Sequence, residues 1–163
     1  MNILVAGATG KTGIRVTEQL REQGHTPIAL VRDSSDTSTL ASDVVLRKGD
    51  LTNLTSDACE GCDAVIFAAG SGGSTGPEMT DKVDRDGAKD LIDIAARSDV
   101  SRFVMLSSVG ADTPDPDSEL AHYLQAKHDA DVHLQYSGLE YAILRPVALT
   151  DDAGNRNMIF GDD

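Results

Sequence analysis

The stretch GATGKTG at residues 7–13 decides the fold of this chain. It carries three glycines at GxxGxxG spacing. It stands between the apolar run Asn2–Ala6, which predicts a buried strand, and the segment Gly13–Gln23, whose apolar residues recur at helical spacing. Glycines in such a strand-to-helix turn let the backbone approach a diphosphate, and the helix N-terminus offers unpaired N–H groups. The motif therefore predicts a dinucleotide-binding turn, and a tight turn that binds no ligand is the alternative.

Outside this turn, short apolar runs alternate with helical or polar segments. Strands are expected at 27–31, 43–47, 64–69, 102–106 and 141–144, and helices at 82–97 and 118–137. Because parallel strands need crossovers that return over a sheet face, this alternation indicates an α/β fold, a doubly wound parallel sheet of the Rossmann type with about six strands. The length of 163 residues predicts a single domain, residues 1–163.

The charge balance narrows the range of partners. Twenty-seven acids against 14 bases leave a net charge of −13, and such a field repels phosphate backbones and anionic membranes, so neither is expected as a partner. No apolar run approaches the roughly 20 residues of a membrane span and no secretory signal is evident, so a cytoplasmic location is expected. The acids are 21 Asp and 6 Glu, which fits either a halophilic protein or an ordinary solvated acidic surface.

The end of the second expected strand bears on the choice of cofactor. In dinucleotide-binding folds an acidic residue at this place binds the ribose 2′-hydroxyl of NAD, whereas an arginine meets the 2′-phosphate of NADP. Arg32 occupies the place and Asp33 follows it. We therefore expect NADP rather than NAD, unless Arg32 is only a solvated loop charge.

A tyrosine and a lysine stand four residues apart in the last expected helix. The spacing of Tyr123 and Lys127 brings the phenol and the ammonium to one helix face, about one turn apart. A free tyrosine has a pKa of about 10, so a nearby cation is needed if the phenolate is to form near neutral pH. Lys127 could supply that cation.

Further short motifs accompany these features over nearly the whole chain. The set consists of GATGKTG, Gly49–Leu51, Phe67–Gly70, Leu106–Ser108, Tyr123xxxLys127 and Leu144–Pro146. In this combination the chain resembles the short-chain dehydrogenase/reductase superfamily. Within it, the chain resembles the atypical branch of NAD(P)-binding and epimerase/dehydratase-like proteins, which is related to flavin and biliverdin reductases and to redox-sensing NADPH binders.

The resemblance implies a role for each matching residue. The family's tyrosine passes a proton to or from a carbonyl or hydroxyl group while hydride moves to or from the nicotinamide, and its lysine lowers the pKa of the phenol and binds the ribose. Tyr123 and Lys127 match these positions. A family serine after the fifth strand binds the substrate oxygen; Ser107 or Ser108 could do so, and we favour Ser108. The cofactor-binding residues implied are Gly7, Thr9, Gly10, Lys11, Thr12, Gly13, Arg32, Asp50, Leu51, Ala68, Ala69, Gly70 and Lys127.

Two departures from the family pattern concern the chemistry more than the cofactor. Asp84 stands where extended members carry an asparagine of the catalytic tetrad. Relatives also continue beyond the segment Leu144–Pro146 into elements that build the substrate pocket, so the substrate lobe looks curtailed at the C-terminus. The chain is expected to be a natural short form, a fragment, or a protomer whose pocket a neighbouring copy in a homodimer completes.

Three functions follow from this reading of the sequence. Tyr123 and Lys127 favour an NADP-dependent oxidoreductase or epimerase/dehydratase-like enzyme that acts on a small carbonyl or hydroxyl compound. The short distal part favours a non-catalytic NADPH-binding sensor, and the flavin and biliverdin reductases suggest hydride transfer without a protein proton donor. No metal is expected, because Cys59 and Cys62 stand alone without a histidine at ligand spacing. We interpret both as packing residues, with a redox-active pair as the alternative.

Overall fold

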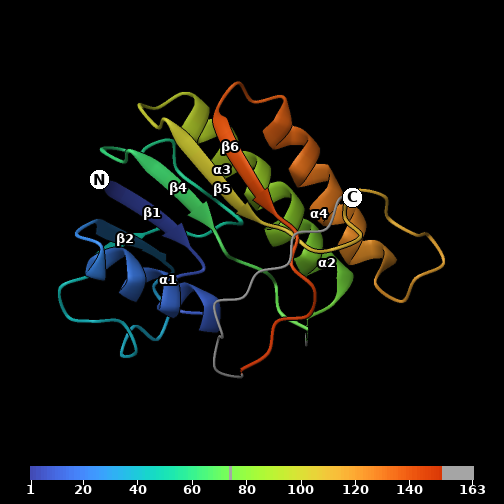
Figure 1. Ribbon diagram of the computed structural model, residues 1–163, viewed down its shortest axis with the longest axis horizontal. Helices are drawn as coiled ribbons and strands as arrows, with labels where there is room; N and C mark the ends of the chain where they lie inside the picture. Colours follow the sequence, from blue (N-terminus) through green and yellow to red (C-terminus); the bar gives the residue numbers. More distant parts are fainter. Residues whose placement is uncertain (74, 152–163) are drawn as a thin grey trace.

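The computed structural model describes residues 1–73 and 75–151, and Figure 1 shows its ribbon. The sheet has six strands, all parallel, in the order β3-β2-β1-β4-β5-β6. The strands are β1 (Asn2–Ala6), β2 (Thr26–Val31), β3 (Val45–Lys48), β4 (Ala64–Phe67), β5 (Arg102–Leu106) and β6 (Glu140–Leu144). The order reverses between β1 and β4, and ligands bind at the carboxyl ends of the strands at such a switch point. The predicted doubly wound sheet of the Rossmann type is confirmed.

Helices cover the two faces of the sheet unequally. Figure 1 shows α1 against one face and α2, α3 and α4 against the other. The helices are α1 (Lys11–Glu22), α2 (Pro77–Thr80), the π-helical turn η1 (Asp81–Gly87), α3 (Ala88–Ala96) and α4 (Ala121–Gln135). Since α2, η1 and α3 follow one another without a break, they form one continuous helical segment with a wider turn in its middle.

The sheet divides the apolar core into two layers. The larger layer joins inward residues of β4 and β5, such as Phe67 and Phe103, to Leu134 of α4 and the buried face of α3. The smaller layer packs alternate strand residues, among them Val5 and Val31, against α1. The strands are buried on both faces near β1, which is why they appear in the sequence as continuous apolar runs rather than as alternating patterns.

On the face of the sheet that α1 covers, the helix does not extend as far as the β6 edge. Ile143 packs into the larger core layer, so the alternation along the strand turns the exposed Leu144 to the opposite, open side. Within residues 1–73 and 75–151, no helix covers that side over β5 and β6.

The sequence-based boundaries differ most from the structure in the helical segment after β4. The sequence predicts a helix over 82–97, whereas helical structure begins at Pro77 and ends at Ala96. Proline suits the first helical position, because its φ is preset and its missing N–H would have had no intrahelical partner. The strand predicted over 64–69 ends at Phe67, and the predicted domain 1–163 extends past residue 151, so its last part lies outside the described residues.

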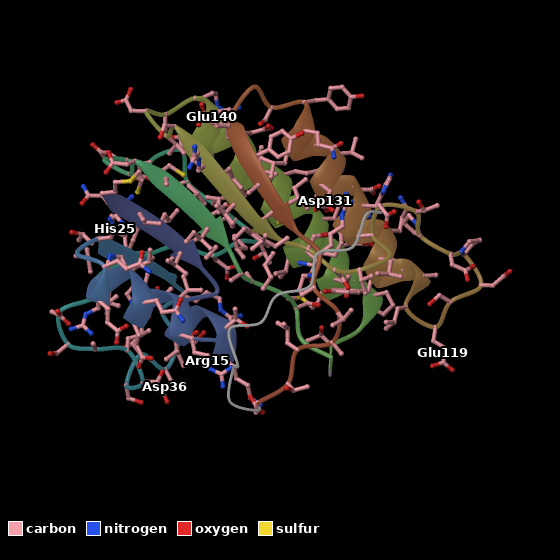
Figure 2. All side chains as sticks on the ribbon, viewed as in Figure 1. Arg15, His25, Asp36, Glu119, Asp131 and Glu140 are labelled. Atoms are coloured by element: carbon pink, nitrogen blue, oxygen red, sulfur yellow. The ribbon has the colours of Figure 1, made fainter. Side chains whose placement is uncertain are left out.

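Charged side chains lie mainly at the surface of the molecule. In Figure 2 the labelled Asp36, Glu119 and Glu140 lie at the periphery, whereas Asp131 lies inside, between the sheet and α4. Asp131 and Asp84 are fully buried, together with Lys127. No helix in the described part of the chain combines the length and the apolar character needed to cross a bilayer.

Candidate functional site

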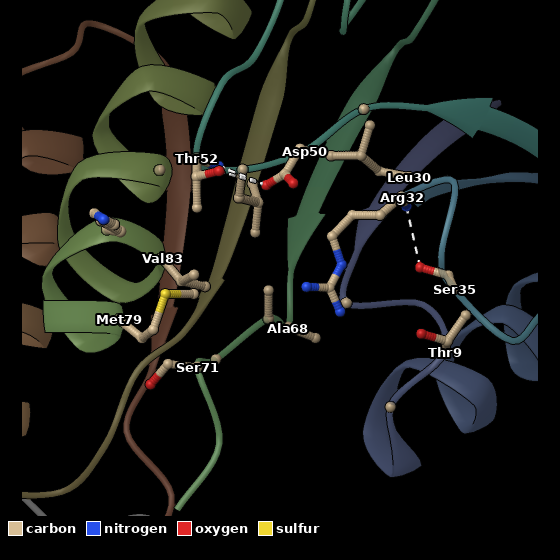
Figure 3. Close-up of a pocket in the computed structure, with 18 of the residues that line it drawn as sticks. Thr9, Leu30, Arg32, Ser35, Asp50, Thr52, Ala68, Ser71, Met79 and Val83 are labelled. Carbon is tan, nitrogen blue, oxygen red and sulfur yellow. Dashed lines mark hydrogen bonds between the residues drawn. The ribbon is translucent and has the colours of Figure 1, made fainter. Parts of the chain in front are cut away.

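A cavity of about 640 Å³ opens at the switch point, where the chain leaves the carboxyl ends of β1, β2 and β4. Figure 3 shows the pocket between the turn before α1, the end of β2 and the helical segment after β4. The predicted cofactor-binding residues that line it are Gly7, Thr9, Gly10, Arg32, Asp50, Leu51, Ala68, Ala69 and Gly70. The structure thus brings together segments that are far apart in the sequence, as binding of one extended ligand requires.

The glycine turn forms the floor of this pocket. Gly7 has φ +82°, and a Cβ on it would lie 2.7 Å from the backbone of Ala68 and Ala69. A Cβ on Gly13 would lie 2.1 Å from the carbonyl oxygen of Gly7, so Gly13 lets α1 start directly beneath the turn and does not itself line the pocket. Gly10 caps α1 without a side-chain hydrogen bond, and the first turn holds no acidic residue. The N–H groups at this end can therefore bind an anion such as a diphosphate.

The end of β2 places a cation in the pocket and turns a carboxylate away from it. Arg32 lines the cavity, and Figure 3 shows its guanidinium directed into it. The backbone N–H of Arg32 donates to Oγ of Ser35 at 3.1 Å, which fixes the loop that follows the strand. The side chain of Asp33 is 95% exposed and pairs with Lys48, with 3.3 Å between Oδ1 and Nζ. The charge that faces the pocket from this loop is therefore positive.

The opposite wall is acidic and is built with help from another glycine. Oδ1 of Asp50 accepts hydrogen bonds from the backbone N–H and the hydroxyl of Thr52 at 2.9 and 2.8 Å. These two bonds hold the pKa of Asp50 below its ordinary value. A Cβ on Gly87 would lie 2.6 Å from the carbonyl oxygen of Leu51. Gly87 therefore lets the helical segment approach the loop after β3 and close the pocket.

Several lining residues come from this helical segment and were not predicted. They are Met79, Lys82, Val83, Asp86, Gly87 and Asp90. No motif of the sequence analysis covers them, but they recur three or four residues apart and so form one face of the helical segment, which is turned to the pocket. Four predicted cofactor-binding residues do not line the cavity: Lys11, which pairs with Asp151, its neighbours Thr12 and Gly13, and Lys127.

Tyr123 and Lys127 lie one turn apart on α4, as their spacing predicts. Nζ of Lys127 is 5.8 Å from the centroid of the Tyr123 ring, and Tyr123 shares a hydrogen bond with Ser108. Ser107 is buried and donates from Oγ to Oδ2 of Asp131 at 2.8 Å. The geometry therefore leaves Ser108, the serine that we favour, beside the phenol, while Ser107 is engaged inside the protein.

Lys127 occupies a different place from the one expected. Its side chain is 3% exposed and does not line the pocket; Nζ lies 3.2 Å from Oδ1 of Asp84 and donates to the carbonyl oxygen of Leu106 at 3.3 Å. Burial raises the pKa of Tyr123, the carboxylates of Asp84 and Asp131 raise it further, and the hydrogen bond with Ser108 acts in the opposite direction. The pKa of Tyr123 is therefore shifted upward rather than downward in this structure.

Comparison with known proteins points to the same class of ligand as the pocket does. A family described as NAD(P)H-binding matches residues 7–163. The chain belongs to this NAD(P)H-binding family.

Relatives of this chain are named as epimerases, epimerase/dehydratases or oxidoreductases. The uncharacterized sugar epimerase YhfK of Bacillus subtilis is 38% identical over 94% of this chain and 75% of its own length. A Bacillus halodurans protein, described as a suggested NAD-dependent epimerase/dehydratase, has a solved structure with a TM-score of 0.86 and 39% identity, covering 95% of this chain and 74% of that one. The structure of the oxidoreductase YlbE from Lactococcus lactis gives a TM-score of 0.81 at 28% identity, with coverage of 95% and 73%.

More distant structures share the fold alone. WbmH of Bordetella bronchiseptica, solved in complex with NAD+, gives a TM-score of 0.75 at 18% identity, over 88% of this chain and 55% of that one. This likeness supports the Rossmann-type sheet and says nothing of the catalytic residues of the present family member.

A second ion pair lies deeper under α4. Nε of Arg145 is 3.1 Å from Oδ2 of Asp131, the same oxygen that accepts from Ser107. The two fully buried carboxylates, Asp84 and Asp131, thus each have a cationic partner. The interior beneath the family's tyrosine position is electrically balanced, as burial of ionised groups requires.

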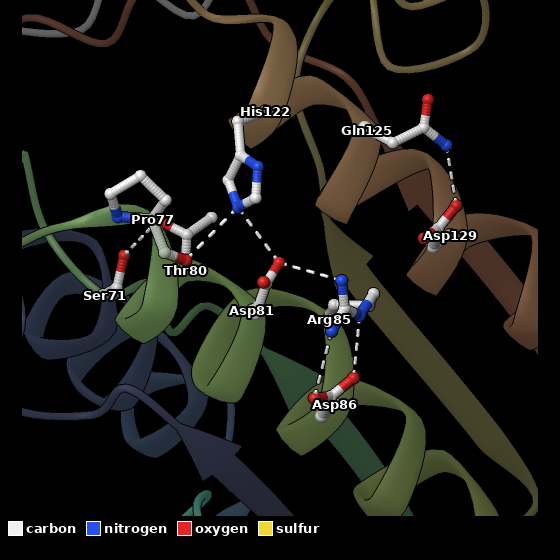
Figure 4. A network of polar contacts seen from close by, with 9 residues as sticks. All are labelled: Ser71, Pro77, Thr80, Asp81, Arg85, Asp86, His122, Gln125 and Asp129. Atoms are coloured by element: carbon white, nitrogen blue, oxygen red, sulfur yellow. Dashed lines mark hydrogen bonds and ion pairs between the residues drawn. The ribbon is translucent and has the colours of Figure 1, made fainter.

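His122 belongs to a polar network beside the pocket rather than to its wall. Nε2 of His122 lies 3.0 Å from Oδ1 of Asp81 and 3.2 Å from the carbonyl oxygen of Pro77. Arg85 donates from Nη1 to the same Oδ1 at 2.8 Å and pairs with Asp86. Figure 4 shows that this network joins the start of α4 to α2 and η1. It holds together the two helical segments that carry Tyr123 and Asp84.

The two cysteines are packing residues. Cys59 and Cys62 are free and buried, and burial raises the pKa of Cys59 to about 12. Arg47 donates to Sγ of Cys62 at 3.2 Å, but the pKa of Cys62 is raised as well, again chiefly by burial. Thiols held in the protonated form are poor nucleophiles, so the packing interpretation is confirmed. The described residues contain no group of three or more His, Cys, Asp or Glu side chains that could hold a metal ion.

Proposed function

We propose that this protein is an NADP-dependent oxidoreductase or epimerase/dehydratase-like enzyme that acts on a small carbonyl or hydroxyl compound. The observation that carries the proposal is the cavity at the switch point, which combines an anion-binding glycine turn with Arg32. One end of the cavity is connected to the Tyr123 helix, since the backbone N–H of Ser71 donates to Asp84, which pairs with Lys127. Membership of the NAD(P)H-binding family supports the cofactor class.

The residues that line the cavity fit the parts of a nicotinamide dinucleotide. The N-terminal N–H groups of α1 would hold the diphosphate, Asp50 would accept from the adenine amino group, and Ala68 to Gly70 would contact the central part. A nicotinamide, when bound, supplies or accepts a hydride. The chain's own contribution to the chemistry would be the proton at Oη of Tyr123, with Ser108 orienting the substrate oxygen.

The choice of NADP over NAD rests on the loop after β2. Arg32 faces the pocket, while the carboxylate of Asp33 is turned out to Lys48. A 2′-phosphate would gain a charge-assisted hydrogen bond from the guanidinium, whereas a 2′-hydroxyl would lack the carboxylate that NAD-binding sites place there.

Calorimetry with NADPH and NADH tests this proposal. We expect tighter binding of NADPH, and we expect Arg32→Ala to weaken NADPH binding by roughly ten- to a hundredfold and NADH binding little, because a hydrogen bond to a charged group contributes about 1.5–3 kcal/mol. Arg97→Ala removes the same charge from an exposed position outside the pocket and should change neither affinity. Equal affinities of the unaltered protein for the two cofactors would contradict the role of Arg32.

One observation favours a second candidate, an NADPH-binding sensor or a reductase that uses no protein proton donor. Neither Tyr123 nor Lys127 lines the cavity at the switch point. The two candidates differ in the effect of Tyr123→Phe, which impairs turnover only if the phenol gives or takes the proton.

A further inference from the structure

Asp84 is the buried titratable group at the junction of pocket and catalytic helix. Its side chain is 0% exposed. Oδ1 lies 3.2 Å from Nζ of Lys127, and Oδ2 accepts from the backbone N–H of Ser71 at 2.9 Å. The backbone packs tightly around it, because a Cβ on Gly70 would lie 3.2 Å from Oδ1. One carboxylate therefore fixes both a pocket-lining loop and the only lysine of α4.

The π-helical turn positions this carboxylate. Asp84 lies in the middle of η1 and is buried with Gly87, while the neighbouring Arg85 and Asp86 pair with each other at the surface. A π-helical turn changes the direction in which a side chain leaves the helix, and such turns occur frequently at functional sites. Lys127 is enclosed from the other side by the rings of Phe67 and Tyr123, 5.7 and 5.8 Å from Nζ to each centroid.

We propose that Asp84 is a positioning residue that pairs with Lys127 inside the protein, so that the ammonium does not ionise the neighbouring phenol and Tyr123 serves the site as a proton donor. A lone ammonium beside the ring would favour the phenolate. A carboxylate 3.2 Å from that ammonium opposes its field at the phenol, which lies next to the same ammonium.

The charged and polar groups that face Tyr123 from each neighbouring element agree with this assignment. From α4 they are Lys127 and Asp131, from η1 Asp84, and from the loop after β5 the hydroxyl of Ser108. Both carboxylates and burial of the ring raise the pKa of Tyr123, and only the hydrogen bond with Ser108 lowers it. An asparagine in place of Asp84 would leave the charge of Lys127 without a counterion.

The consequence for turnover rests on the proposed function. In carbonyl reduction, the hydride that a reduced nicotinamide would supply forms a C–H bond at the carbonyl carbon. The O–H bond of Tyr123 breaks as an O–H bond forms on the carbonyl oxygen, and a proton from solvent restores the phenol. A phenol that keeps its proton performs this step at neutral pH. The reverse step, removal of a proton from a hydroxyl substrate, would need alkaline pH.

Titration of the tyrosines by their near-ultraviolet phenolate absorbance tests the assignment without substrate or cofactor. The chain has three tyrosines and no tryptophan, and Tyr136 and Tyr141 are 86% and 46% exposed. The difference between the parent protein and Tyr123→Phe isolates Tyr123. We expect Tyr123 to ionise above the two exposed tyrosines in the parent, and Asp84→Asn to lower its midpoint by roughly one pH unit or more.

The control for this titration is a variant that removes a carboxylate far from Tyr123 in the sequence. Asp99→Asn, at an exposed position, removes the same charge and should leave the midpoint unchanged. The same midpoint in Asp84→Asn as in the parent, or a Tyr123 that already ionises below the exposed tyrosines in the parent, overturns the assignment. Failure of Tyr123→Phe to affect turnover, with the midpoints as expected, would instead overturn the proposed catalytic role.

Lys127→Met provides a second route if Asp84→Asn does not fold. Without its partner, the buried Asp84 carboxyl is compatible with the interior only when protonated. The variant should therefore be closest to the parent in stability at mildly acidic pH and should lose stability relative to the parent as pH rises to neutral. A stability difference that does not change over this pH range would overturn the ion pair.

Discussion

The glycine turn and the Tyr123–Lys127 pair are both short sequence motifs, but they differ in their surroundings and in the groups on which their function depends. The turn lies on an open cavity, and its function depends on backbone geometry at Gly7 and Gly13, where a Cβ would collide with other backbone atoms. The pair lies partly under the surface, and its ammonium is bound to Asp84 in the interior. A motif that works through its own backbone keeps its function wherever the fold forms, whereas a motif that works through charge depends on which other charges the fold brings to it.

Turnover of Tyr123→Phe should show the largest effect in the catalytic region. If the phenol donates the proton, the variant should lose roughly 10²–10⁴ in turnover of any carbonyl substrate, which is the usual contribution of a positioned acid. NADPH affinity should change little, because Tyr123 does not line the cofactor cavity. A variant that turns substrate over as fast as the parent would make Tyr123 a packing residue and place the sensor or donor-free reductase first.

The next largest effect is on the free energy of unfolding, which should fall more when a buried ion pair is broken than when an exposed one is. Lys127→Met at neutral pH should lower the free energy of unfolding by about 3–5 kcal/mol, because it leaves a fully buried carboxylate without a counterion. Combination with Asp84→Asn should recover much of that loss. Lys48→Met breaks an exposed pair with Asp33 and should cost at most about 1 kcal/mol. If chemical denaturation gave the same loss in the free energy of unfolding for both lysine variants, the buried pair would be no more important for stability than the exposed one.

A glycine-to-alanine substitution, which adds one methyl group, tests whether the glycine turn depends on close backbone packing. A Cβ on Gly13 would lie 2.1 Å from the carbonyl oxygen of Gly7, whereas Gly73 has nothing within 4 Å. We expect Gly13→Ala to cost about 1–3 kcal/mol in stability and to impair NADPH binding, as overpacking forces the backbone to shift, while Gly73→Ala changes neither. Unimpaired NADPH binding by a folded Gly13→Ala protein would show that the turn tolerates displacement.

The smallest effect concerns the surface charge. The net charge of −13 should make the protein more stable as KCl rises from dilute to molar, because screening relieves repulsion among the excess carboxylates. A series of thermal unfolding curves measures this. A melting temperature that stays constant or falls with salt would favour the ordinary solvated surface over adaptation to salt.

The same contrast explains what the sequence could predict. Gly7, Gly10 and Arg32 are identified by their places at the ends of strands, which the apolar runs locate directly, and the structure puts all three at the cavity. Asp50 and Leu51 are implied only by the family resemblance, and they line the cavity as well. For Gly7, Gly10 and Arg32, local sequence and strand order are sufficient.

The rest of the site depends on contacts between segments distant in sequence. The pairing of Asp84 with Lys127 joins residues 43 positions apart, and Asp84 lies in a π-helical turn where the sequence predicts a regular helix. Asp86 and Asp90 reach the pocket through the same segment. Helical spacing predicts that Tyr123 and Lys127 are neighbours, which they are, but it carries no information on what neutralises the lysine.

The most direct test of this contrast is a crystal structure of the protein in complex with NADPH. We predict that the guanidinium of Arg32 contacts the 2′-phosphate and that the diphosphate lies over the N-terminus of α1, while Nζ of Lys127 remains beside Asp84. A complex in which Lys127 has left Asp84 to bind the ribose hydroxyls, with the 2′-phosphate away from Arg32, would contradict the account in both regions.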